Sequence, residues 1–262
     1  MSAPASPPDE PAREAPLRGD PLRLGVGICA LNEAETLPRL LARLLDPSDG
    51  TDRADLVVVA DGGSTDGTPD LVRARGAVCL PTGRGRGLQL RAAAERLLEE
   101  GAEVLLFLHA DSLPRLGALR SIRAALGPDG DRSCDAVAMA QVIDAPDRVY
   151  RWIERAADAR ANRGMVYGDS GLAVRASLYR DAGGFRDLPL FEDVDLSKRL
   201  RRMTRIQVLE DAELVISARR WQEEGVLRCT TRNWILRGLF ECGVPPAALE
   251  RLYRPGSGRR AP

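Results

Sequence analysis

The first half of the chain contains four short, almost continuous apolar runs, each followed by a polar or glycine-bearing turn. They read LRLGVGICAL, ADLVVVAD, AVCLP and EVLLFLHAD, at residues 22–31, 54–61, 77–81 and 103–111. Segments with helical spacing separate them, at residues 33–45, 68–76 and 86–101. Strands that are apolar on both faces and alternate with helices are typical of a parallel sheet covered on both sides. We therefore predict an α/β fold with a Rossmann-like, mostly parallel central sheet and helices on both faces.

The alternation weakens after about residue 113, although the pattern still predicts helices at 116–127 and 147–164 and a strand at 134–143. No internal repeat or second linker interrupts the chain, so we expect one domain over residues 22–254. Residues 1–21 are rich in proline and alanine and lack the basic and apolar regions of a signal peptide. We expect a disordered tail there and a flexible tail at 255–262.

Composition argues against several classes of protein. The 38 basic and 38 acidic residues cancel, so no overall positive field favours nucleic acid. The five cysteines are scattered without a CxxC pair, which fits a reducing cytoplasm better than a disulfide framework or a zinc site. No run approaches 18 apolar residues, so no membrane-spanning helix is expected.

Open parallel sheets bind ligands beyond the carboxyl ends of their strands, where two polar turns of this chain lie. Asp61 ends a strand and is followed by GGSTDGT, which fits either a capped strand–turn–helix or a nucleotide pocket. The segment TGRGRGLQL puts glycines and arginines at a helix start, which suits a diphosphate or a solvated surface loop.

The only histidine, His109, precedes Asp111 by two residues at the end of the fourth run. A carboxylate at this place suits Mg²⁺ or Mn²⁺, and an imidazole beside it is better tolerated by Mn²⁺. The same two residues are also compatible with a packed strand end and a helix N-cap.

Two further clusters lie in the second half. Glu192, Asp193 and Asp195 occupy a predicted helix start, where acids complement the helix dipole or where one of them acts as a general base. The sequence ARRW at 218–221 fits a phosphate clamp, an acceptor platform or a partly buried edge.

The order of these motifs resembles glycosyltransferase family 2. The motifs are ALNEAETL, VVVADGGSTDGT, GRGRGLQL, LLFLHADSLP, YGDSGLAVRASLYRDAGGF, LPLFEDVDLSKRL and ARRW, and the resemblance covers residues 22–254. The sequence His-Ala-Asp, where relatives carry Asp-x-Asp, is most similar to the selenium-domain or radical-SAM associated transferases.

The resemblance implies a hexosyltransferase-like enzyme with a GT-A fold, a nucleotide-diphosphate sugar donor, Mn²⁺ or Mg²⁺, and inversion at the anomeric carbon. It implies a nucleotide-sugar half at 22–113 and an acceptor half at 114–254. Asp111 and His109 would hold the metal, and Asp193 would be the general base with Glu192 beside it. The implied nucleotide and donor residues are Ala30, Leu31, Asn32, Glu33, Asp61, Gly62, Arg86 and Gln89. The implied acceptor or phosphate residues are Gly168, Asp169, Arg219, Arg220 and Trp221.

The chain departs from that subgroup at Arg91 and Ala93, where asparagine and glycine are usual, and this puts Arg91 near the donor pocket. A nucleotidyltransferase is an alternative, but its glycine- and lysine/arginine-rich first turn is replaced here by the acidic ALNEAET. A non-catalytic nucleotide-sugar binding protein would lack Asp193.

The acceptor stays open between a lipid, a small molecule and a glycan. Residues 225–244 fit a helix that packs on its own domain or one that lies peripherally at the inner membrane face.

Overall fold

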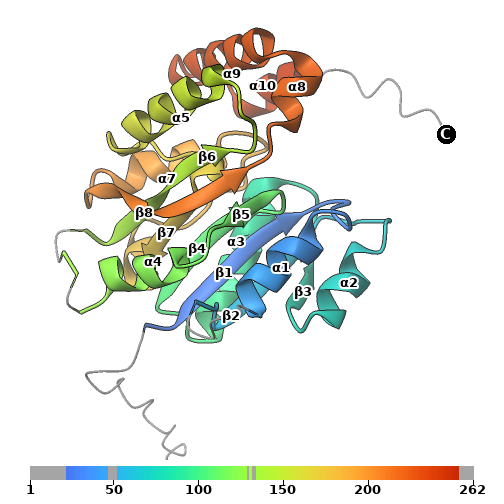
Figure 1. The fold of residues 1–262 in the computed structure, drawn as a ribbon, viewed down its shortest axis with the longest axis vertical. Coiled ribbons are helices and arrows are strands. Elements are labelled where there is room, and N and C mark those ends of the chain that lie inside the picture. The colour runs from blue at the N-terminus through green and yellow to red at the C-terminus, as the bar shows by residue number, and fades with distance from the viewer. Residues whose placement is uncertain (1–21, 47–51, 129, 132–133, 254–262) are drawn as a thin grey trace, which may run out of the picture.

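The four apolar runs form the parallel part of a twisted sheet (Figure 1). The computed structural model describes residues 22–46, 52–128, 130–131 and 134–253. Across these residues the sheet has the order β3-β2-β1-β4-β7-β6-β8-β5, and β3, β2, β1 and β4 run parallel. The strands are β1 (Leu24–Ala30), β2 (Leu56–Asp61), β3 (Val78–Pro81), β4 (Val104–His109), β5 (Ser112–Pro114), β6 (Ala136–Ile143), β7 (Leu172–Arg175) and β8 (Ile206–Ile216).

Antiparallel pairing explains why the alternation weakens in the second half. Strand β7 runs antiparallel to both β4 and β6, and β5 runs antiparallel to β8, while β6 and β8 are parallel. Strand β8 therefore ends at the same edge of the sheet as β4. The predicted α/β fold with a mostly parallel sheet is confirmed, and the antiparallel strands β5 and β7 are among the elements that the periodicity did not reveal.

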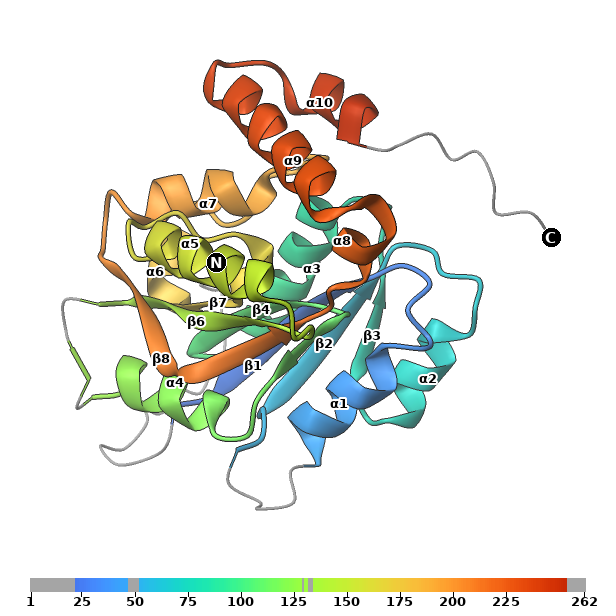
Figure 2. The same cartoon turned by 45° about the horizontal axis from the view of Figure 1, so that its top comes forward.

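Helices cover both faces of this sheet (Figure 2). Helices α1, α2 and α4 lie on one side of the sheet, and α3, α6 and α7 lie on the other. The helices are α1 (Leu37–Leu45), α2 (Thr68–Ala74), α3 (Arg86–Glu99), α4 (Ala118–Leu126), α5 (Arg148–Ala161), α6 (Ala176–Asp181), α7 (Glu192–Leu200), α8 (Arg219–Glu224), α9 (Val226–Glu241) and α10 (Pro246–Tyr253), with a 3₁₀ turn η1 (Gly168–Ser170). None of the helices in the described ranges is both long and apolar enough to cross a bilayer.

Helix α3 is brought close to the segment before α7 by a glycine. A Cβ at Gly87 would collide with the backbone oxygen of Arg186 and lie 2.9 Å from that of Leu188. Only glycine permits this approach, which places the first residue of α3, Arg86, beside the first residue of α7, Glu192.

Helices α8 to α10 lie above the carboxyl edge of the sheet (Figures 1 and 2). A small apolar cluster of Leu190, Leu236 and Leu249 attaches them to the loop before α7, and Phe240 of α9 packs on Phe191 with ring centroids 5.0 Å apart. The predicted tails at 1–21 and 255–262 lie outside the described residues.

Candidate active site

A cavity of about 470 Å³ lies between the carboxyl ends of β4 and β8 and the helices α8 to α10. Its walls combine acids from the sheet edge with arginines and aromatic residues from the helices above. The lining includes Arg86, His109, Asp111, Tyr167, Gly168, Asp169, Asp193, Arg219, Arg220, Trp221, Asn233, Arg237 and Tyr253. The cavity thus lies beyond the carboxyl ends of the strands, where the sequence predicts a ligand site.

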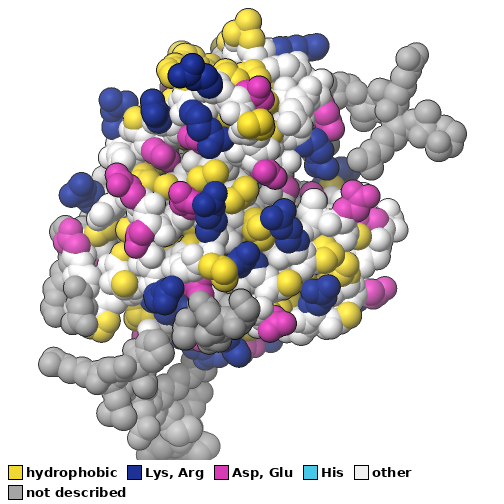
Figure 3. All heavy atoms as spheres, in the orientation of Figure 1, with side chains coloured by type: hydrophobic (Ala, Val, Ile, Leu, Met, Phe, Trp, Pro, Cys, Tyr) yellow, Lys and Arg dark blue, Asp and Glu magenta, His cyan; other side chains and the backbone are white. Residues whose placement is uncertain are grey.

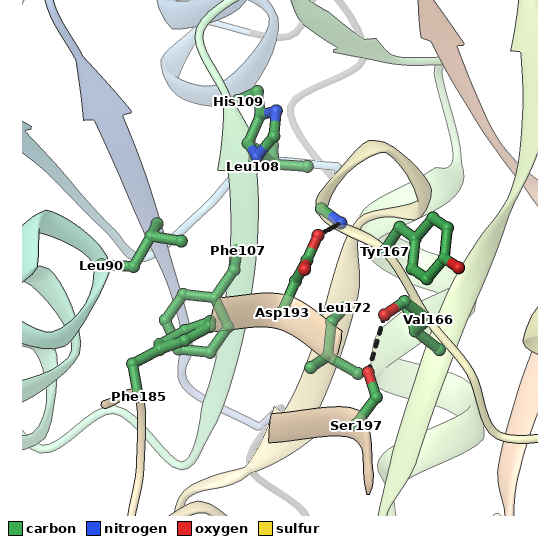
Figure 4. A pocket seen from close by; sticks show the side chains of 11 residues that line it. Leu90, Phe107, Leu108, His109, Val166, Tyr167, Leu172, Phe185, Asp193 and Ser197 are labelled. Carbon is green, nitrogen blue, oxygen red and sulfur yellow. Dashed lines mark hydrogen bonds between the residues drawn. The ribbon is translucent and has the colours of Figure 1, made fainter. Parts of the chain in front are cut away.

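The loop at Gly168 joins His109 and Asp193 (Figure 4). The backbone N–H of Gly168 donates to Asp193 Oδ2 at 2.6 Å, which fixes that carboxylate at the cavity wall. A Cβ at residue 168 would collide with His109 Nε2 and lie 3.4 Å from Asp193 Oδ2. Phe107 and Phe185 lie beside this contact (Figure 4), so His109 and Asp193 are next to an apolar part of the core.

His109 and Asp111 fit a divalent cation. His109 Nε2 is shielded from solvent and has no hydrogen-bond partner among the described residues. Burial, assisted by the charge of Arg86, lowers the pKa of His109, which favours the neutral imidazole that a metal ligand requires. Asp111 is exposed at the same cavity. Within the described residues no group of three or more acids, cysteines and histidines could hold a metal.

A buried ion pair connects the starts of α3 and α7. Arg86 Nε lies 3.3 Å from Glu192 Oε1, and the Glu192 side chain is 1% exposed. Burial raises the pKa of Glu192 to about 7, although the positive charge of Arg86 opposes the shift. Glu192 thus holds a proton more readily than an ordinary carboxyl group, and it directly precedes Asp193 in the chain.

The loops after β1 and β2 are tied to each other. The N–H of Asn32 donates to Ser64 Oγ at 2.8 Å, and Asn32 Oδ1 accepts from the N–H of Thr65 at 2.9 Å. Asn32 adopts a positive φ of 57°, a conformation that asparagine tolerates better than most side chains. The next residue, Glu33, donates its backbone N–H to Thr68 Oγ1 at 3.0 Å, which adds a third link between the two loops.

Asp61 and Gln89 are engaged in holding these loops. The Asp61 carboxylate accepts hydrogen bonds from the N–H groups of Gly63 and Ser64, both at 3.1 Å, and from the Ser64 hydroxyl. Gln89 Nε2 donates to the carbonyls of Ala30 and Ala60, each at 2.8 Å, and so links β1 to β2. The glutamine lies directly under Gly62, where a Cβ would come within 3.1 Å of its amide nitrogen.

The ARRW segment begins α8 and faces the cavity. Trp221 packs edge-on against Tyr150, with ring centroids 6.1 Å apart. Arg220 donates to the Tyr253 hydroxyl, which connects α8 to α10. Burial raises the pKa of Glu33 in the β1 loop, and the positive charge of Arg219 is among the influences that oppose this shift.

The structure brings about half of the sequence-predicted site residues to the cavity. Those that line it are Arg86, His109, Asp111, Gly168, Asp169, Asp193, Arg219, Arg220 and Trp221. Those that do not line it are Ala30, Leu31, Asn32, Glu33, Asp61, Gly62, Gln89 and Glu192. Arg91, which the resemblance puts near the donor, does not line this cavity and pairs with Glu95 at 2.8 Å on an exposed side of α3.

Sequence reasoning missed several residues that line the cavity, among them Tyr167, Asn233, Arg237 and Tyr253. The last three lie in α9 and α10, and the only signal for these was the basic and aromatic composition of residues 217–254. Tyr167 directly precedes Gly168 and could have been included with it.

Comparison with known proteins gives a family and a fold. Residues 25–179 match the model of the family described as glycosyl transferase family 2. The mannosyltransferase PcManGT from Pyrobaculum calidifontis, in complex with GDP-Man and Mn²⁺, superposes with a TM-score of 0.59 at 20% identity, over 93% of this chain and 71% of that one. No curated protein matches the sequence.

Two other solved structures are similar. TarS 1–349 from S. aureus gives a TM-score of 0.57 at 17% identity, over 87% of this chain and 68% of its own. Glucosyl-3-phosphoglycerate synthase from Mycobacterium tuberculosis, with Mn²⁺, UDP and phosphoglyceric acid, gives 0.53 at 20% identity, over 86% and 80%. At such identities the likeness shows a shared fold, which is the GT-A arrangement of sheet and helices.

Proposed function

Because this chain belongs to glycosyl transferase family 2 and is thus a glycosyltransferase, we propose that it moves a sugar from a nucleoside-diphosphate sugar to an acceptor hydroxyl, with inversion at the anomeric carbon. The observation that carries the proposal is the meeting of Asp193 and His109 at Gly168. A fixed carboxylate and a neutral imidazole in one cavity suit a general base opposite a metal-bound leaving group. Family membership favours this activity over nucleotidyl transfer and over binding without catalysis.

We assign the donor to residues 22–113 and the acceptor to the cavity walls built by residues 114–254. The linked loops at Asn32 and Ser64 support a nucleotide beside the carboxyl ends of β1 and β2. The complexes of PcManGT with GDP-Man and of glucosyl-3-phosphoglycerate synthase with UDP support a nucleotide sugar as donor.

Asp111 and His109 would hold a divalent cation, as the Mn²⁺ and Mg²⁺ complexes of the neighbours support. When bound, the cation would neutralise charge on the leaving diphosphate. Arg86 and Arg219, at the same cavity, add fixed positive charge near that group.

Asp193 is our candidate for the general base. Its Oδ2 accepts from Gly168 and its Oδ1 accepts from the N–H of Val194, both at 2.6 Å, so the side chain is held in one orientation. A carboxylate in this position would take the proton of the acceptor hydroxyl as the oxygen attacks the anomeric carbon. Glu192, held by Arg86, would position the start of α7 and keep Asp193 aligned.

We also propose that the chain falls in the subgroup of selenium-domain or radical-SAM associated transferases. The His-Ala-Asp sequence at 109–111 supports this assignment.

We propose that α9 contacts an anionic lipid surface. Leu227, Trp234 and Ile235 are 82%, 65% and 57% exposed, while the opposite side of the helix buries Leu236. Hydrophobic and basic side chains gather together at this end of the molecule (Figure 3), and Arg228 of α9 is exposed. Apolar side chains next to arginine suit the interface of a bilayer that carries negative charge.

Thermal unfolding with UDP, GDP and dTDP, each with and without Mn²⁺, tests the transferase proposal. A ligand that binds only the folded chain raises its melting temperature by mass action. We expect one diphosphate to stabilise the wild type in the presence of metal, and Asp111→Ala to lose that stabilisation. A wild-type melting temperature that no nucleotide changes would contradict the proposal.

A further inference from the structure

Two arginines from different helices meet on one tyrosine at the end of the cavity. The guanidinium carbon of Arg160, from α5, lies 3.7 Å from the centroid of the Tyr167 ring. That of Arg237, from α9, lies 5.2 Å from the same centroid. Tyr167 and Arg237 both line the cavity. The two positive charges are therefore close to each other and to the cavity wall, in the group that we call the arginine–tyrosine cluster (Arg160, Tyr167 and Arg237).

The two guanidinium groups of this cluster have few close carboxylate partners. The nearest carboxylate recorded for Arg160 is Asp169, at 4.0 Å from Nη2, which is the limit of an ion pair. In the described part of the chain Arg237 forms no ion pair with a carboxylate, and its Nη2 donates to the sulfur of Met165 at 2.8 Å. The neighbouring Arg232, by contrast, is paired with Glu224. The acids around Tyr167 are Asp169 and Asp193, and within the described residues neither forms a hydrogen bond with Arg160 or Arg237, so both guanidinium groups stay available to an anion.

The cluster also holds polar atoms without partners. Nε and Nη2 of Arg160 and the hydroxyl of Tyr167 are shielded from solvent and form no hydrogen bond in the described residues. Burial raises the pKa of Tyr167 to about 12, so the hydroxyl keeps its proton and can donate. Buried donors without acceptors cost free energy, which an anion with several oxygens would recover.

The cluster lies next to the loop that holds the proposed base. Tyr167 immediately precedes Gly168, whose N–H donates to Asp193. An anion on the arginine–tyrosine cluster would therefore lie on the side of the base, where the attacking hydroxyl must arrive. Because Gly168 also packs on the proposed metal ligand His109, the donor diphosphate must be in place before binding to the cluster is measured.

We propose that the arginine–tyrosine cluster binds an anionic group, carboxylate or phosphate, carried by the acceptor. This assignment rests on the proposed function and specifies its acceptor as a negatively charged hydroxyl compound. The planar guanidinium of Arg237 would bind two oxygens of the anion side by side.

Inorganic phosphate is the probe for this site. The full chain is first saturated with Mg²⁺ and the nucleoside diphosphate that stabilises it, so that the donor phosphate site is filled. Phosphate is then titrated by calorimetry at constant ionic strength. We expect binding to the wild type, at least about tenfold weaker binding to Arg237→Gln, and unchanged binding to the matched control Arg155→Gln, an exposed arginine on α5, the helix that carries Arg160.

Tyr167→Phe is the second variant, since it keeps the ring under both guanidinium groups and removes only the unpaired hydroxyl. It should weaken phosphate binding while its melting temperature without phosphate stays at or above that of the wild type. Phosphate binding that disappears once the diphosphate is bound, or that Arg237→Gln leaves unchanged, overturns the assignment. The two proposals can be told apart by their failures. If no nucleotide binds, the transferase proposal is wrong and the acceptor assignment fails with it. If a nucleotide binds but phosphate finds no second site, only the acceptor assignment is wrong.

Discussion

Gly168 packs so closely against His109 that residue 168 cannot carry a Cβ without displacing the imidazole. The contact joins the end of β4 to the 3₁₀ turn before β7, and the N–H of the same glycine holds Asp193 at 2.6 Å. One small residue thus sets the relative positions of the proposed metal ligand and the proposed base.

Gly168→Ala should disrupt this arrangement. The added methyl group must push His109 or the turn aside, and we expect a loss of about 1–3 kcal/mol in the free energy of unfolding. Metal-dependent nucleotide binding should weaken as well. Urea unfolding and the nucleotide titration measure both effects.

Gly238→Ala is the matched control, because a Cβ there meets nothing within 4 Å and the residue lies inside α9. It should leave stability unchanged or raise it by up to about 1 kcal/mol. Equal stability and binding in both variants would show that the space at Gly168 is not needed.

Asp193→Asn should abolish most of the transfer while leaving donor binding intact. The amide keeps an oxygen that can accept from Gly168 but cannot take a proton, so we expect the rate to fall by about 100-fold or more. Release of nucleoside diphosphate from the donor sugar, with water as a slow acceptor, measures this rate without a known acceptor. A wild-type rate in the Asp193→Asn variant would exclude Asp193 as the base.

Glu192 should make the stability of the chain decrease as pH rises towards neutrality. Burial raises its pKa in the folded state to about 7, above its ordinary value of 4.5. Between these values the folded chain keeps a proton that the unfolded chain has released, so the stabilisation is complete below about 4.5 and is lost as pH rises through 7.

The measurement is urea unfolding of wild type and Glu192→Gln at several pH values between about 4.5 and 8, which span the two pKa values. Glutamine does not titrate, so the difference in the free energy of unfolding should shift in favour of the variant as pH rises. Parallel pH profiles would show that Glu192 titrates alike in the folded and unfolded chains.

The sequence allowed the parallel half of the fold to be predicted because each strand there is apolar on both faces. It was equally informative at the end of β4, where an isolated histidine and an aspartate interrupt an apolar run. The sequence was least informative for polar residues that can either bind a ligand or hold neighbouring loops and strands together. Asp61 and Gln89 belong to motifs expected at the donor, and the structure also gives both a role in the fold, since the Asp61 carboxylate accepts from the Ser64 turn and Gln89 Nε2 donates to carbonyls of β1 and β2.

The helices above the cavity could not be placed from the sequence. Residues of α9 and α10 reach the site through a contact between Leu236, Leu249 and Leu190, which are far apart in the chain. No local periodicity encodes such a contact. Arg237 therefore appeared only as one arginine among many, although its place beside Tyr167 gives it a specific role in our proposal.

Trp234→Ala should weaken binding of the chain to vesicles that contain anionic phospholipid. Trp234 is 65% exposed on α9, so its removal costs little stability in solution, whereas insertion of the indole into the interface is lost. We expect roughly tenfold weaker binding in a co-sedimentation assay with mixed phosphatidylglycerol and phosphatidylcholine vesicles. The matched control is Trp152→Ala, since Trp152 is 59% exposed but lies on α5. Equal binding of the two variants, or a wild type that stays in the supernatant, would contradict the proposal that α9 contacts an anionic lipid surface.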